Sequence, residues 1–307
     1  MGRRLRSRDL TVVGGPGGKQ FGVVPEPSIP ELEEMAALGW QAGEQSRLGG
    51  WLLRAAEGFT GRANSTLPLG EPGLRLPAAV DAVQQWYHER GLRPMVVIPY
   101  SMAGPGGDPL DRLLARRGWT VRPGAAVVMT AASSDVARAG PAGPDGAPGV
   151  EISGRPDAAW LSCYHYRGQP APAAAERLLV SAPWQAFAGL RRDGEIVAIG
   201  RIAVAAGWAG LSAIEVAPAY RRRGLATAII GALGMVAVQQ GAERTYLQVE
   251  DANDNAQGLY VRCGFAPHHR YHYRLAPMPG PLPGCDACAA AVMGINTKRL
   301  PHHAPLL

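Results

Sequence analysis

The chain has 307 residues, of which 47% are hydrophobic and 18% charged, and its formal net charge is +6. This composition is typical of a globular protein and excludes a disordered chain, and the length suggests about two domains. All but two of the 31 basic residues are arginine, and they are spread along the chain. We therefore expect no nucleic-acid partner.

The sequence also argues against a membrane or secreted protein. It contains no apolar run long enough to span a bilayer, and no apolar segment follows the basic first residues as in a signal peptide. Four scattered cysteines are too few for a disulfide framework. The sequence predicts a cytoplasmic protein without a membrane partner.

Shifts in composition divide the chain into five segments. A flexible N-terminal arm covers residues 1–28, and a first α/β unit covers 29–131. Residues 132–149, rich in Gly, Pro, Ala and Asp, are expected to form a linker. A second α/β unit covers 150–276, and a Pro-rich tail covers 277–307.

The expected elements alternate between helices and strands in both units. The first unit is predicted to contain a helix over 31–43, strands over 51–54 and 63–67, a helix over 76–90, a strand over 95–98, a helix over 109–117 and a strand over 125–129. The second unit is predicted to contain a strand over 150–152, helices over 158–167 and 173–181, strands over 185–190, 195–204 and 210–217, a helix over 225–240, a strand over 246–249, a helix over 256–263 and a strand over 269–275.

The two units share a local pattern. Residues 113–119 parallel residues 259–265, and each stretch follows a helix, a glycine and an apolar strand. This pattern favours an internal duplication, with chance similarity of helix endings as the alternative.

The junction before residues 225–240 carries the clearest chemical signal. A predicted strand ends at Ala217, three arginines follow at 221–223, and a helix begins at Gly224 or Leu225. Helix N-termini present unpaired N–H groups and a partial positive charge, which suits a diphosphate. The helix contains no charged residue, so we expect it to be buried against a sheet.

Two motifs resemble the GNAT superfamily of N-acetyltransferases. Arg221-x-x-Gly224-x-Ala226 is similar to the family's Arg/Gln-x-x-Gly-x-Gly/Ala signature. About 30 residues later, the stretch from Asn253 to Phe265 is similar to the family's Asn-x-x-Ala-x-x-Leu-Tyr-x-x-x-Gly-Phe segment. On this resemblance, residues 150–275 are identified as a GNAT domain with an α/β fold built on a mixed sheet.

The resemblance implies acetyl-CoA as co-substrate and an amine acceptor. No metal is expected, because the histidines of the last strand have no acidic or thiol ligands near them in the sequence. It assigns the diphosphate to the loop at 221–227 and the pantetheine arm to the backbone at Val216 and Ala217. It makes Tyr260 the proton donor to the leaving thiolate, with a packing role as the alternative, and it brings Asn253 to the pantetheine, with a helix N-cap as the alternative. The implied coenzyme-binding residues are Val216, Ala217, Arg221, Arg222, Arg223, Gly224, Leu225, Ala226, Thr227, Asn253, Ala256 and Tyr260.

The general base is not fixed by the resemblance. Glu215, at a strand end beside the expected coenzyme site, is the first candidate, and Glu250 is the second. Deprotonation through water is a third route, and either glutamate could instead be a surface charge or part of an ion pair.

Other chemistry-bearing residues are given structural roles or tied to the acceptor. Cys263 is expected to pack at a helix end, and the pair Cys285 and Cys288 is not expected to bind zinc. In the last strand, alternation places His268, Arg270 and His272 on one face and His269, Tyr271 and Tyr273 on the other. That strand and residues 164–166 are candidates for lining the acceptor pocket.

The first unit lacks the residues expected to do chemistry. Leu114 stands where the second unit has Tyr260, and no Arg-x-x-Gly-x-Ala occurs near residues 73–77. We interpret this unit as a degenerate GNAT-like half, as in tandem GNAT proteins with one active half. The main alternative to an enzyme is a catalytically silent acyl-CoA-binding sensor or scaffold. The oligomeric state is left open between a monomer and a homodimer.

Overall fold

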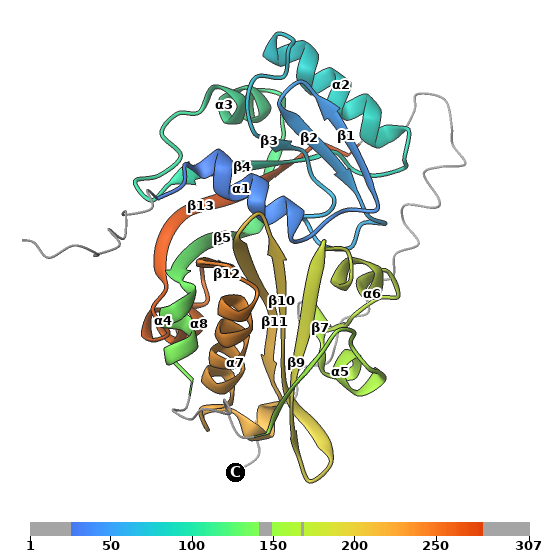
Figure 1. The fold of residues 1–307 in the computed structure, drawn as a ribbon. Coiled ribbons are helices and arrows are strands. Elements are labelled where there is room, and N and C mark those ends of the chain that lie inside the picture. Colours follow the sequence, from blue (N-terminus) through green and yellow to red (C-terminus); the bar gives the residue numbers. More distant parts are fainter. Residues whose placement is uncertain (1–25, 141–148, 167–168, 279–307) are drawn as a thin grey trace, which may run out of the picture.

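The computed structural model describes residues 26–140, 149–166 and 169–278, and it has the predicted mixed α/β architecture (Figure 1). One sheet has eight strands in the order β4-β13-β5-β12-β11-β10-β9-β6, and smaller sheets have the orders β1-β2-β3 and β7-β8. The strands are β1 (Glu44–Leu48), β2 (Trp51–Ala55), β3 (Leu67–Pro68), β4 (Met95–Ser101), β5 (Thr120–Ala132), β6 (Val150–Ser153), β7 (His165–Tyr166), β8 (Gln169–Pro170), β9 (Trp184–Arg192), β10 (Glu195–Ala205), β11 (Trp208–Val216), β12 (Arg244–Glu250) and β13 (Ala266–Leu275).

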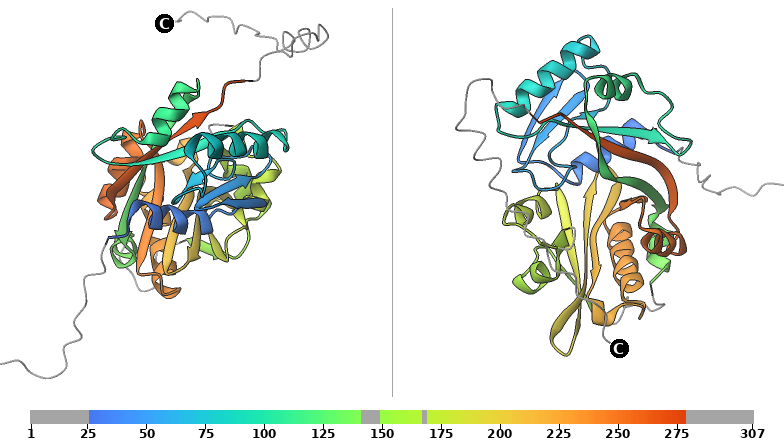
Figure 2. Two further views of the ribbon diagram at one scale, coloured as in Figure 1. Left: turned by 90° about the horizontal axis from the view of Figure 1, so that it is seen from above. Right: turned by 180° about the vertical axis from the view of Figure 1, so that it is seen from behind.

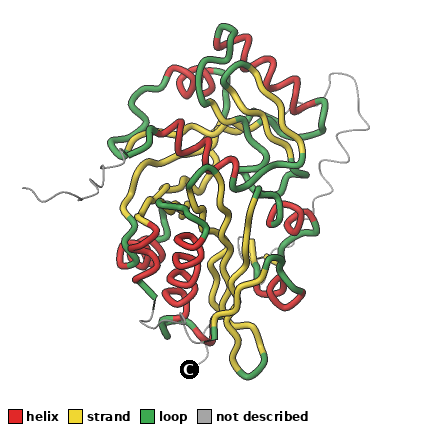
Figure 3. The backbone as a smooth tube through the Cα atoms, in the orientation of Figure 1, coloured by secondary structure: helices red, strands yellow, loops and turns green. Residues whose placement is uncertain are grey.

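Helices cover the sheet and fill the connections, as the tube in Figure 3 shows. They are α1 (Ile29–Leu38), α2 (Leu76–His88), α3 (Pro109–Arg116), α4 (Ser133–Arg138), α5 (Ala158–Cys163), α6 (Ala174–Leu179), the 3-10 turn η1 (Pro218–Tyr220), α7 (Leu225–Gln239) and α8 (Asp254–Arg262). None of the helices in the described ranges is both long and apolar enough to cross a bilayer.

The two halves of the chain repeat one order of elements. Strands β1, β2 and β3 pair in sequence, and a parallel bridge between Thr66 and Val96 links the end of this sheet to β4. In the second half, β9, β10 and β11 pair in sequence, and β11 runs parallel to β12. Helices α2 and α7 occupy the same place in the two series, as do α3 and α8.

The last strand of each half is inserted into the other half. Strand β13 lies between β4 and β5, while β5 lies between β12 and β13, and all three pairings are antiparallel. Figure 2 shows these two strands running side by side through both halves. The predicted units therefore share one continuous sheet.

Several element boundaries differ from the prediction. The predicted strand over 63–67 is a loop up to Leu67, and β1 was not predicted. The helix expected over 158–167 ends at Cys163, where a short hairpin follows. The predicted N-terminal arm before residue 26 and the predicted tail beyond residue 278 lie outside the described residues.

The first part of the predicted linker over 132–149 is helical. Residues 133–138 form α4, in which Ser133 and Val136 are buried. The Ser133 hydroxyl hydrogen-bonds with the Thr245 hydroxyl on β12 at 2.8 Å. A six-residue helix has little intrinsic stability, so contacts with the sheet and α7 stabilise it rather than its Ala- and Ser-rich sequence.

Helix α7 is buried, as its lack of charge predicts. Its residues 228–234 are buried, and it packs against strands β9–β11 on one side and α4 on the other. The crossing with α4 is close, because a Cβ placed on Gly231 would lie 2.4 Å from the Gly140 Cα atom. Glycine is required there for the backbones to approach.

A buried arginine links the halves. Arg201 on β10 is 1% exposed and donates hydrogen bonds to the carbonyl oxygens of Leu179 and Gly39, at the C-terminal ends of α6 and α1. Burial lowers its pKa to about 10. Helix C-termini carry partial negative charge, so these two ends offset the guanidinium charge without a carboxylate.

Candidate functional site

The parallel strands β11 and β12 separate partway along their length. They pair from Trp208 to Leu211 on β11 and from Arg244 to Leu247 on β12. Beyond these residues β11 continues to Val216 and β12 to Glu250. Residues 212–216 of β11 therefore have no β12 partner, which leaves an opening in the sheet with backbone polar groups along one side.

The N-terminus of α7 lies just after this opening. Gly224 is the N-cap, with φ of +77°, and no side chain caps the helix. The first helical residues, 225–227, are half-buried, while residues 221–224 are exposed. The free N–H groups of this helix end are therefore open to an anionic ligand.

Two of the three arginines hold the loop in place. Arg221 donates through Nε to the Val216 carbonyl at 3.1 Å, and Arg223 donates to the Ala219 carbonyl at 3.1 Å. Arg222 has a left-handed backbone, with φ of +62°. All three side chains remain exposed, so their charges surround the helix end.

Helix α8 carries the second motif. The Asn253 side chain accepts a hydrogen bond from the Ala256 N–H at 3.1 Å, so it is the N-cap of the helix. Tyr260 is half-buried, and its ring meets Phe265 edge-on at 6.0 Å. No hydrogen bond to its hydroxyl is present within the described ranges. Burial raises the pKa of Tyr260 to about 12, so the phenol is protonated at neutral pH.

Glu215 is held by His165, a contact that the sequence did not reveal. Its carboxylate accepts from the His165 backbone N–H at 2.8 Å, and the His165 Nδ1 atom lies 3.3 Å from the other oxygen. Burial raises the pKa of Glu215, and the contacts with His165 partly offset this effect. Both residues had been singled out, but separately.

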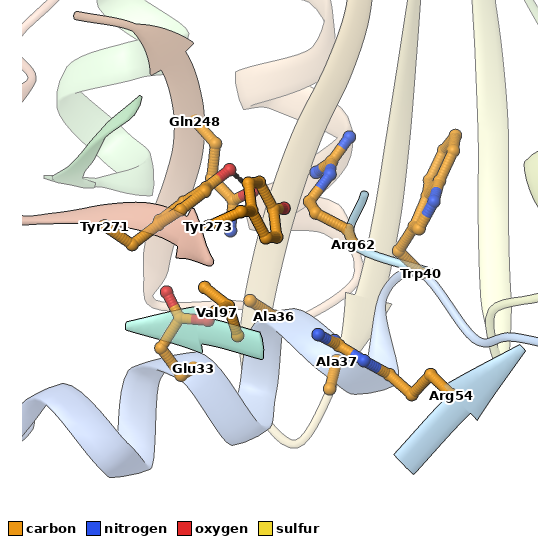
Figure 4. Close-up of a pocket in the computed structure, with 10 residues that line it drawn as sticks. All are labelled: Glu33, Ala36, Ala37, Trp40, Arg54, Arg62, Val97, Gln248, Tyr271 and Tyr273. Carbon is orange, nitrogen blue, oxygen red and sulfur yellow. Dashed lines mark hydrogen bonds between the residues drawn. The ribbon is translucent and has the colours of Figure 1, made fainter. Parts of the chain in front are cut away.

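A cavity of about 300 Å³ lies near the end of β12. It continues inward to a water-sized pocket of about 10 Å³ (Figure 4), and the two share Arg62, Gln248, Tyr271 and Tyr273. Glu250 lines the larger cavity, whereas Glu215 does not. The lining comes from both halves: Thr60, Gly61, Arg62, Arg122, Gly124 and Ala126 from the first, and Tyr164, Gln248, Val249, Glu250, Tyr271 and Tyr273 from the second.

Strand β13 presents different groups on its two faces. Tyr271 and Tyr273 line the cavity, and His269 is buried against Glu33 of α1 at 2.9 Å. His272 turns toward Asp111 of α3, at 2.9 Å. The predicted alternation holds from His269 onward, but His268 contacts His269 at 2.7 Å instead of lying on the opposite face. The register shift between Pro267 and His269 accounts for this difference.

The cysteines and possible metal ligands singled out in the sequence show no sign of a further reactive site within the described ranges. Cys263 is 1% exposed within the core beside α7, as expected for a packing residue. Within the described ranges, no group of three or more His, Cys, Asp or Glu side chains is placed to hold a metal ion. Cys285 and Cys288 lie outside those ranges.

The first half has a cavity at its own β3–β4 junction. It has a volume of about 450 Å³ and is lined by apolar and acidic residues together with several prolines, with no lysine, arginine or histidine. Leu114, the counterpart of Tyr260, is completely buried. This lining offers no positive charge to a diphosphate.

Residues 27–274 match the family described as "Probable histone acetyltransferase Rv0428c C-terminal". The "Uncharacterized N-acetyltransferase YobR" of Bacillus subtilis (strain 168) is 30% identical over 257 residues, which cover 80% of this chain and 98% of that protein. The chain belongs to this family and is a GNAT N-acetyltransferase. Both halves lie within the matched region, so the family extends well beyond the two motifs.

Solved structures of other GNAT proteins have a similar fold. A GCN5-related N-acetyltransferase from Kribbella flavida matches with a TM-score of 0.56 at 18% identity, covering 84% of this chain and 97% of that one. A tandem GNAT protein from the clavulanic acid biosynthesis pathway matches with a TM-score of 0.55 at 15% identity, covering 81% and 89%. The resemblance to tandem GNAT proteins is thus confirmed at the level of the fold.

Proposed function

We propose that this protein transfers the acetyl group of acetyl-CoA to a primary amine by direct attack in a ternary complex. One observation carries the proposal: the opening between β11 and β12 leads directly to the uncapped N-terminus of α7. An extended thioester arm and a diphosphate would each find unpaired main-chain groups there, in the order in which they occur in the coenzyme.

The coenzyme contacts follow from this placement. The N–H groups of Leu225, Ala226 and Thr227 would donate to the diphosphate, with the arginines at 221–223 around it. Just after β11, the Ala217 N–H already donates to the Val197 carbonyl at 2.9 Å. The pantetheine contact therefore belongs to Val216 and the residues before it, while Asn253 and Ala256 bound the site from α8.

The chemical step requires two proton transfers. The amine nitrogen forms a bond to the thioester carbon, and the carbon–sulfur bond breaks. Tyr260 donates a proton to the leaving thiolate, and Glu215 accepts the proton that the amine loses. Exchange with solvent then restores both side chains. The raised pKa values of both groups support these roles, because the phenol stays protonated and the carboxylate is a stronger base than an exposed glutamate.

The test of the function is a panel of amines in which coenzyme release is measured with acetyl-CoA present. Acceptor-dependent release supports the transferase. Tight binding of acetyl-CoA without release for any amine would instead support a silent acyl-CoA-binding sensor.

We expect Gly224→Glu to raise the dissociation constant of acetyl-CoA by about 100-fold or more, because a carboxylate would occupy the diphosphate site. A Cβ atom at this position meets no other atom within 4 Å, so the substitution adds backbone strain at φ of +77° but no steric clash. Isothermal titration calorimetry measures the effect. Gly241→Glu is the matched control, because Gly241 has φ of +72°, equally open surroundings and a place at the other end of α7. Equal affinity in both variants would contradict the diphosphate assignment.

The pH dependence of kcat/KM tests the base. Burial raises the pKa of Glu215 above its ordinary 4.5, so the rate should fall as the pH decreases through that raised value. Glu215→Gln should lower kcat/KM by about 100-fold and remove this acidic limb. Since the His165 side chain lowers the pKa of Glu215, His165→Ala should move the limb to higher pH. Loss of the limb in Glu250→Gln, with Glu215→Gln unaffected, would assign the base to Glu250.

A further inference from the structure

Two arginines of the first half line the cavity of about 300 Å³ near the end of β12, and neither has a carboxylate partner among the described residues. Arg62 and Arg122 are both half-buried, and neither forms an ion pair with any residue that the structure describes. The Arg62 guanidinium lies 4.8 Å from the centre of the Trp40 ring, and that of Arg122 lies 5.4 Å from the Tyr273 ring. Aromatic faces orient both groups. One terminal nitrogen of Arg122 donates a weak hydrogen bond to the Met95 sulfur at 3.6 Å, and the other N–H donors of the two groups remain available to a ligand.

The loop that carries Arg62 has a strained backbone. Thr60 has φ of +61°, which is rare for a β-branched residue. The Asn64 side chain holds the loop, accepting from the N–H groups of Ala56 and Gly58 and donating to the Thr60 carbonyl at 2.9 Å. The Trp40 indole also donates to the Thr60 hydroxyl at 3.1 Å. Strain that is held in this way is characteristic of binding sites.

The strained loop brings the two arginines into one cavity. A Cβ atom on Gly61 would lie 2.8 Å from a terminal nitrogen of Arg122 and 2.8 Å from the Tyr273 ring, so any side chain there would displace Arg122 or Tyr273 from its place in the cavity. Figure 4 shows Arg62 with Tyr271 and Tyr273 around the inner end of this space. The two guanidinium groups therefore converge on the cavity that also holds Glu250.

The charges of the lining restrict the ligand. Two arginines face one glutamate, Glu250, in the cavity, while Glu33 farther in is engaged by His269. A ligand that pairs with the arginines must carry a negative group, and an acetyl acceptor must carry an amine. The volume of about 300 Å³ suits a small molecule.

We infer that the acceptor is a small amine that also carries a carboxylate, such as an amino acid. Arg62 and Arg122 donate hydrogen bonds to its carboxylate, and its amino group lies at the opening between β11 and β12, where Glu215 of β11 would accept its proton. The inference rests on the proposed function and specifies its substrate class. A lysine-rich peptide would place further positive charge against both arginines and should be a poor acceptor.

Matched pairs of acceptors test the inference. Phenylalanine and phenethylamine, lysine and cadaverine, and histidine and histamine differ only in the carboxylate. Coenzyme release is measured for each compound, and for a lysine-rich peptide, at saturating acetyl-CoA. For at least one pair, we expect kcat/KM to be about 10- to 100-fold higher for the amino acid.

Variants of the arginines supply the second readout. Arg62→Gln and Arg122→Gln should each lower kcat/KM for the amino acid by about tenfold or more, while changing that of the decarboxylated amine by less than about threefold. The acetyl-CoA affinity, measured by calorimetry, should be unchanged. Arg116→Gln, at an exposed position on α3, is the control. A thermal melt of each variant verifies folding.

The failure of this inference can be told apart from failure of the function. Turnover that is equal or faster with the decarboxylated amines or with the lysine-rich peptide would overturn the substrate class and leave the transferase intact. A loss of kcat/KM in Arg62→Gln that is equal for both members of a pair would also overturn the substrate class and leave the transferase intact. Binding of acetyl-CoA without release for any acceptor would overturn both.

Discussion

Replacing Tyr260 with phenylalanine should lower kcat by about 10²- to 10⁴-fold and leave the affinity for acetyl-CoA nearly unchanged. The thiolate leaving group needs a proton, and the substitution removes a donor whose pKa of about 12 keeps it protonated over the whole neutral range. Within the described part of the chain the hydroxyl makes no hydrogen bond, and the ring contact with Phe265 survives in the variant. The fold should therefore tolerate the change.

Single-turnover and steady-state measurements of coenzyme release, together with calorimetry, separate the effects on rate and binding. Tyr100→Phe is a suitable control, because Tyr100 is a half-buried tyrosine on β4 whose ring contacts His272. Equal turnover by wild type and Tyr260→Phe would remove Tyr260 from the acid role and assign it to packing on α8.

Gly231→Ala should destabilise the protein by about 3 kcal/mol, the upper end for an overpacked core position. The new methyl carbon would lie 2.4 Å from the Gly140 Cα atom and 2.5 Å from its backbone nitrogen. Both are backbone atoms, so a rotamer change cannot relieve the clash, and α4 must move away from α7. The free energy of unfolding, measured in urea, reports the loss.

Gly258→Ala provides the matched control, because it is also a substitution of glycine within a helix. The nearest atom to its Cβ would be a terminal nitrogen of Arg262 at 3.6 Å, which is an ordinary contact at the end of a flexible side chain. This variant should be stabilised by about 0.5–1 kcal/mol through helix propensity. A Gly231→Ala protein as stable as the wild type would show that α4 does not pack closely on α7.

Sequence patterns predicted the elements that depend mainly on residues close together in the chain. The uncharged apolar run predicts α7 and its burial, and the glycines at 91, 118, 241 and 264 mark helix ends that all have positive φ. The exchange of β5 and β13 could not be predicted, because an apolar strand does not specify its neighbour in a sheet. Helix α4 was not predicted for a related reason, because its stability comes from contacts with residues distant in the sequence, such as Thr245.

Some residues of the candidate site could be predicted from the sequence, and others could not. The motifs place the loop at 221–227 and Tyr260 by spacing alone, because the strand and helices between them fix their geometry. Nothing near Arg62 or Arg122 in the sequence marks either as a cavity residue. Their convergence depends on the unusual backbone at Thr60 and on the insertion of β5 beside β12, and both are set by tertiary contacts.

The exchanged strands make the first half a structural requirement for the second. Deleting it would strip β12 of its antiparallel neighbour β5 and leave β13 without either strand that flanks it. The exposed edges would invite aggregation. A chain interlocked in this manner cannot lose either half and keep its sheet, so the two halves must be retained together.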